Sequence, residues 1–150
     1  MSTLLERLST ALAEVSTSVE EADDALTVTV DGLVASLRVV TIAEGLEMVS
    51  LTQPLAWDLA LTNKIRERVA VLAGRTMLGT VALVEKAVEA PTAPANGASA
   101  KATRRPASKK LADVMLRYNF PAAGLTEEAL RTLIMLVLTT GADVRRSLLA

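Results

Sequence analysis

The sequence predicts an α+β fold in the order α-β-β-β-α-β-β-α, with a five-stranded antiparallel sheet packed with helices. Two observations predict it. Some segments place apolar residues every three or four positions, as helices do, and others alternate apolar and polar residues, as strands do. The pair Asp31-Gly32 between two alternating segments is a strong hairpin signal. A chain of 150 residues can bury a core as one domain, which we predict over residues 1–150.

The first element predicted is an amphipathic helix over residues 3–20. Its apolar stripe consists of Leu4, Leu5, Leu8, Leu12, Val15 and Val19. The acidic run at residues 20–24 opposes the helix dipole at a C-terminus, so the helix is expected to end there.

A three-stranded antiparallel meander is predicted next. Leu26, Val28 and Val30 alternate with threonines, and the Asp31-Gly32 turn leads into a return strand over residues 33–42. A third strand is predicted over residues 46–52. Pro54 cannot donate a backbone hydrogen bond, so we expect it to end that strand and to start an apolar connector over residues 55–59.

The second half of the chain predicts a helix, two strands and a final helix. The helix begins after Thr62 or Asp58 as N-cap and ends near Gly74. Strands are predicted over residues 78–85 and 111–120. The last helix begins at the N-cap Thr126, and Gly141 is expected to end or kink it.

An Ala-, Pro- and Lys/Arg-containing insert at residues 87–110 separates these last two strands. It holds few large apolar residues, so burial cannot offset its ordering entropy, and we predict that it is disordered. The 40 residues after it hold only one strand and one helix, too little for a separate core. The strands on either side are therefore predicted to pair with each other.

Composition excludes several functional classes. The chain has no cysteine and no histidine, which removes the commonest nucleophile–base pairs and metal ligands. It has no glycine-rich phosphate loop, so we predict no catalytic residues, no cofactor and no metal site. The 16 basic and 17 acidic side chains balance, and three aromatic residues give no stacking platform, so nucleic acid is not expected as a partner. No apolar stretch approaches the length of a membrane span, and no signal peptide is recognisable, so cytoplasm is the expected location.

Four stretches resemble a known group, the YbjN-like and type III secretion chaperone proteins. Residues 46–58 resemble that group's third strand and its apolar approach to the middle helix, and residues 78–83 its fourth strand. Residues 114–121 resemble its fifth strand, which runs into a proline, and residues 125–130 the start of its last helix. The resemblance implies a cytoplasmic, often dimeric protein that binds segments of other proteins. The long insert departs from the short turn usual in that group.

Two surfaces are candidates for partner binding. The first surrounds Trp57, the only tryptophan, with Leu51 and Leu55 beside it; the alternative is that Trp57 plugs the end of the sheet. The second is the wide apolar side of the last helix at Met135 and Leu136, which could equally be buried. The basic residues of the insert could contact phosphate or an acidic partner, or belong to a solvated tether.

Ile65, Val69 and Leu72 on the middle helix are candidate homodimer contacts, because this region helps to form dimers in the resembling proteins; the alternative is packing on the sheet. The expected function is a non-enzymatic, chaperone-like protein-binding module whose partner is a protein or peptide segment. The alternative is a structural or assembly subunit of a homo- or hetero-oligomer.

Overall fold

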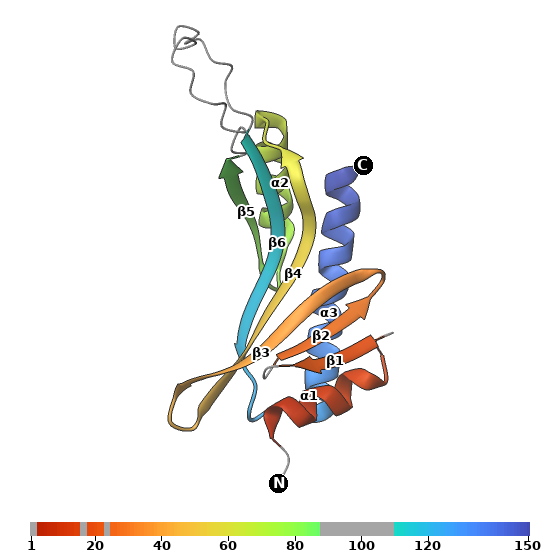
Figure 1. Cartoon of the computed structure of the whole chain (residues 1–150), viewed down its shortest axis with the longest axis vertical. Coiled ribbons are helices and arrows are strands. Elements are labelled where there is room, and N and C mark those ends of the chain that lie inside the picture. Colours follow the sequence, from red (N-terminus) through yellow and green to blue (C-terminus); the bar gives the residue numbers. More distant parts are fainter. Residues whose placement is uncertain (1–2, 16–17, 23–24, 88–109) are drawn as a thin grey trace, which may run out of the picture.

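The computed structural model describes residues 3–15, 18–22, 25–87 and 110–150, and the backbone alone at 18–22 and 87. Three helices and six strands are present in these ranges (Figure 1). In chain order they are α1 (Leu4–Ala13), β1 (Ser18–Ala22), β2 (Ala25–Val30), β3 (Leu33–Ala43), β4 (Leu46–Ala60), α2 (Asn63–Arg75), β5 (Thr80–Ala87), β6 (Lys110–Pro121) and α3 (Glu127–Leu149).

The strands form one antiparallel sheet in the order β1-β2-β3-β4-β6-β5. The predicted α+β class and antiparallel sheet are therefore confirmed, and all five predicted strands are present. β6 lies between β4 and β5, so the pairing of β4 with β6 joins the last two strands to the meander. The predicted pairing of the strands on either side of the insert is also confirmed, because β5 and β6 pair from Thr80 and Arg117 to Ala87 and Lys110. The insert itself lies outside the described residues over 88–109.

A sixth strand replaces the end of the predicted first helix. α1 ends at Ala13, and residues 18–22 form β1, which pairs with β2. The predicted helix over residues 3–20 was therefore wrong in its last part. Pairing with β2 gives the backbone N–H and C=O groups of this segment hydrogen-bond partners. This pairing outweighs the helix preference that the spacing of Val15 and Val19 indicates.

One turn signal and two N-cap signals predicted three boundaries correctly. Asp31 and Gly32 both have positive φ, 53° and 77°, as the two-residue hairpin turn requires. The hydroxyl of Thr62 accepts a hydrogen bond from the Ile65 N–H at 3.1 Å, and that of Thr126 accepts one from the Ala129 N–H at 3.0 Å.

Pro54 and Gly141 do not break their elements. β4 continues through Pro54 to Ala60, and its register with β6 shifts directly after Pro54 and again between Ala56 and Leu59. These irregularities accommodate a residue without an N–H. α3 continues through Gly141 to Leu149, and α2 passes Gly74 and ends one residue later. The predicted connector over residues 55–59 is therefore part of β4.

The helices define a core on one face of the sheet. α1 packs on β1, β2 and β3, α2 on β5, and α3 along β4 and against both other helices (Figure 1). Alternate strand residues such as Leu37, Leu51 and Leu116 are fully buried beneath them. Their neighbours Arg38, Thr52 and Arg117 lie on the opposite face and are exposed or half-buried. No helix in the described ranges is long and apolar enough to cross a membrane.

Candidate functional site

The sheet divides into two arms at the pair Ser36 and Thr52. β3 pairs with β4 from Ala43 and Leu46 as far as that pair, and no further. Beyond it, β3 continues with β2, and β4 continues along β6 to Ala60 (Figure 1). We call the space between the start of β3 and residues 53–60 of β4 the fork. Within the described chain, the β4 edge that faces the fork has a strand partner only up to Thr52.

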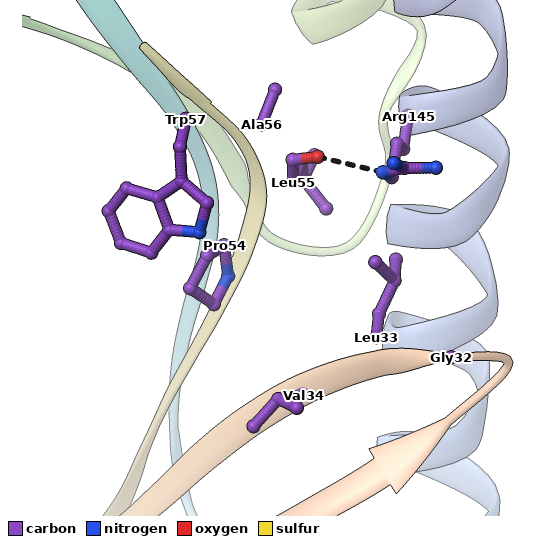
Figure 2. Close-up of a pocket in the computed structure, with 8 residues that line it drawn as sticks. All are labelled: Gly32, Leu33, Val34, Pro54, Leu55, Ala56, Trp57 and Arg145. Atoms are coloured by element: carbon purple, nitrogen blue, oxygen red, sulfur yellow. Dashed lines mark hydrogen bonds between the residues drawn. The ribbon is translucent and has the colours of Figure 1, made fainter.

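A cavity of about 520 Å³ lies in the fork. Its lining comes from the β2–β3 turn, from β4 and from α3 (Figure 2). The lining residues are Gly32, Leu33, Val34, Pro54, Leu55, Ala56, Trp57 and Arg145. All but Arg145 are glycine, apolar or aromatic, so the cavity has apolar walls and one cation. The Arg145 Nε–H donates a hydrogen bond to the Leu55 carbonyl oxygen at 3.0 Å, which holds the guanidinium against β4 (Figure 2).

Trp57 lies at the rim of this cavity with its side chain 58% exposed. It belongs to the irregular part of β4, where the register with β6 shifts. The Lys86 ammonium lies 5.8 Å from the centroid of the ring, a cation–π distance. The indole therefore faces solvent beside a cation, and it does not plug the end of the sheet.

Behind Trp57, an ion cluster fixes the shape of β4. Asp113 on β6 is largely buried, and its carboxylate accepts a hydrogen bond from the Asp58 N–H at 2.9 Å. The same carboxylate forms an ion pair with the Lys86 Nζ at 2.8 Å. Lys86 also pairs with the Asp58 carboxylate. Asp58 has a φ of 54°, a left-handed conformation that is uncommon for a residue other than glycine. The Asp113 carboxylate thus holds the irregular backbone beside Trp57 in place.

The same contacts shift two pKa values. Burial raises the pKa of Asp113, but the hydrogen bonds from Lys86 and from the Asp58 N–H outweigh it and lower the pKa below 3.8. The hydrogen bond to Asp113, and then the one to Asp58, raises the pKa of Lys86 above 10.5. Each shift favours the charged form, so Asp113 and Lys86 are both ionised at neutral pH.

We expect the stabilising effect of Asp113 to depend on pH. The folded-state pKa of Asp113 is lowered, so its contribution to folding stability is present above pH 3.8 and is lost as the pH falls through the folded-state pKa. The folded-state pKa of Lys86 is raised, so its contribution is lost as the pH rises through a pKa above 10.5. The free energies of unfolding of the native chain and of Asp113→Asn, measured in urea, should therefore differ most between these two pH limits. They should become similar in acid. Glu85→Gln is the control, since its ion pair with Arg66 is exposed and weak. A difference between native chain and Asp113→Asn that is the same in acid as at neutral pH would contradict the assignment.

Gln53 is a polar residue in the core, directly beside the fork. It is fully buried, and its Nε2 donates to the Leu138 carbonyl oxygen of α3 at 3.2 Å. Its Oε1 has no hydrogen-bond partner among the described residues and points at Gly141. The glycine allows α3 to approach β4 at this point, so Gly141 has a packing role and does not end the helix.

The predicted contact residues have different environments. Leu51 and Leu55 are buried in the core, so their side chains are not accessible to a partner in this structure. Both side chains point toward the helices, because the alternation of β4 continues as far as Leu55. The prediction of an irregular connector over residues 55–59 left that alternation out. On α3, Met135 is half-buried and Leu136 is 53% exposed. Leu136 and Trp57 are thus the predicted contacts that are accessible.

The predicted dimer contacts face inward. Val69 and Leu72 are buried and Ile65 is half-buried, because this side of α2 packs against β5 and α3. In the single chain the stripe packs on β5 and α3, and its role in a homodimer stays a prediction. The exposed large apolar residue of α2 is Val71.

Comparisons with known proteins do not identify the chain: no family model, no curated protein and no solved structure matches it.

Proposed function

We propose that the chain is a non-enzymatic, chaperone-like protein-binding module that docks an extended segment of a partner protein in the fork. One observation carries the proposal: exposed Trp57 lies beside a β4 edge that no described strand occupies beyond Thr52. The resemblance to secretion chaperones and a cytoplasmic location belong to the same proposal.

The physical basis is strand addition. An unoccupied strand edge presents N–H and C=O groups that an extended peptide can pair with, and such pairing gives affinity for many sequences. An adjacent apolar pocket adds selectivity for side chains. Trp57 supplies the large, partly exposed aromatic surface on which binding energy concentrates in protein interfaces. The ion cluster of Asp58, Lys86 and Asp113 holds this surface before a partner arrives, which reduces the ordering cost of binding.

The test is selection of peptides on the immobilised full chain from a randomised heptapeptide library. We expect Trp57→Ala to weaken binding of the selected peptides about tenfold or more, since it removes the anchor. The free energy of unfolding should change by less than about 0.5 kcal/mol, because the side chain is mostly exposed. Peptide affinity can be measured by titration calorimetry, and stability by urea unfolding followed by circular dichroism.

Two further variants locate the binding site. Met77→Ala is the matched control, because Met77 is an exposed apolar residue outside the fork, between α2 and β5, and should leave affinity unchanged. Leu136→Ala tests the other accessible candidate surface on α3. The proposal fails if no peptide is selected, or if the affinity depends on Leu136 and not on Trp57.

A second function, an assembly subunit, is favoured by the β3–β4 hairpin. This hairpin extends away from the helices (Figure 1), and its exposed apolar side chains are Val40, Ile42 and Leu46. Under this function, the hairpin would be covered in a homodimer or larger assembly. Light scattering distinguishes the two: a mass above one chain that Ile42→Ser returns to one chain supports assembly, while a monomer that binds peptide supports the module.

A further inference from the structure

Arg145 has unused hydrogen-bonding capacity in the fork. A guanidinium has five N–H donors, and the described contact of Arg145 is the Nε–H bond to the Leu55 carbonyl. Both terminal nitrogens are without a partner in the part of the chain that the structure describes. That bond holds Nε of the exposed Arg145 side chain against β4, at the wall of the cavity.

Three other arginines of the described chain have carboxylate partners, unlike Arg145. Arg66 pairs with Glu85, Arg131 with Glu14, and the adjacent Arg146 with Asp143. Arg145 has no carboxylate within ion-pair distance among the described residues, and no acidic side chain lines its cavity. A guanidinium whose terminal nitrogens have no protein partner can bind the two oxygens of a carboxylate. Charge complementarity therefore selects a carboxylate as the ligand group.

The topology of the fork determines which carboxylate can reach it. The fork is closed at the pair Ser36 and Thr52 and open toward Ala60. A strand added antiparallel to β4, as both existing neighbours of β4 are, enters beside Ala60 and runs toward Leu55. It meets the start of β3 there and must end. A parallel strand would instead bring an amino terminus to Arg145, where like charges repel.

We propose that the fork binds the C-terminal end of a partner protein, with its terminal α-carboxylate on Arg145 and its last side chains against Leu33, Val34 and Trp57. This inference rests on the proposed function and specifies its ligand. The apolar walls select apolar final residues. The cavity volume of about 520 Å³ lies within the range of roughly 300–1,000 Å³ typical of ligand sites, which suits the end of a segment.

The experiment compares two randomised heptapeptide libraries on the full chain, one ending in a free carboxylate and one closed as an amide. Peptides selected from the first should lose about tenfold or more in affinity when resynthesised as amides, since a charge-assisted pair is lost. In Arg145→Gln the acid and amide forms should bind equally. Arg146→Gln is the matched control, because this neighbouring arginine pairs with Asp143 and should keep the preference for the acid.

The remaining outcomes separate this inference from the proposed function. Equal binding of acids and amides that still depends on Trp57 would overturn the C-terminal assignment and leave the protein-binding function standing. Amide peptides that bind Arg145 through an internal Asp or Glu would also overturn it. Absence of binders from both libraries would overturn both proposals. If Arg145→Gln fails to fold, the comparison of acid and amide on the native chain still decides the question.

Discussion

Replacement of Gly141 by alanine is expected to destabilise the chain by about 2–4 kcal/mol, although alanine is the better helix former. A Cβ at this position would lie 1.8 Å from Oε1 and 2.7 Å from Cδ of Gln53, and 3.2 Å from the Leu116 side chain. Gln53 is fully buried, so its amide would have to move and give up its hydrogen bond to the Leu138 carbonyl. Urea unfolding followed by circular dichroism measures the loss.

A double-mutant cycle and a second glycine make this expectation specific. In a Gln53→Ala background the clash with Gln53 disappears and only the approach to the flexible Leu116 side chain at 3.2 Å remains, so Gly141→Ala should cost much less. Gly74 in α2 has no atom within 4 Å of the position of a Cβ, so Gly74→Ala should stabilise by up to about 1 kcal/mol. An equal cost of Gly141→Ala with and without the Gln53 side chain would show that another contact is responsible.

Leu51→Ala is expected to cost about 2–5 kcal/mol of unfolding free energy, because its fully buried side chain would leave a cavity between β4 and the helices. Leu136→Ala is the matched control. Both leucines are candidate partner contacts by sequence, but Leu136 is 53% exposed, so its truncation should cost less than about 0.5 kcal/mol. Thermal and urea unfolding of the two variants measure the difference. Similar stability of the two variants would contradict the assignment of Leu51 to the core.

Local signals made most of the fold predictable. The Asp31-Gly32 turn and the Thr62 and Thr126 caps depend on a few adjacent residues, so the sequence identifies them without knowledge of the tertiary structure. β1 was missed because its conformation depends on an available edge of β2. β4 was cut short because Pro54 ends a regular strand, whereas here the register with β6 shifts around it.

The site was predictable only where a residue type is distinctive by itself. Trp57 was predicted because it is the only tryptophan and lies near Pro54 with leucines on either side, a composition typical of a partner-binding anchor. Arg145, Lys86 and Asp113 come from three different elements and approach this part of β4 only in the folded chain, so no spacing along the sequence relates them to Trp57. Asp113 had one weak signal: an acidic residue within an apolar, alternating strand suggests a buried partner.

The pairing of β5 and β6 gives the chain a natural insertion point. Ala87 and Lys110 are register partners, so the backbone leaves and re-enters the sheet at neighbouring positions whatever the length of the sequence between them. Each doubling of such a closed loop costs only about 0.6 kcal/mol of chain entropy. A tight two-residue turn or a whole folded domain could therefore replace residues 88–109 with the strand register unchanged. Engineering could use this junction to attach a reporter at the end of the sheet where the fork opens.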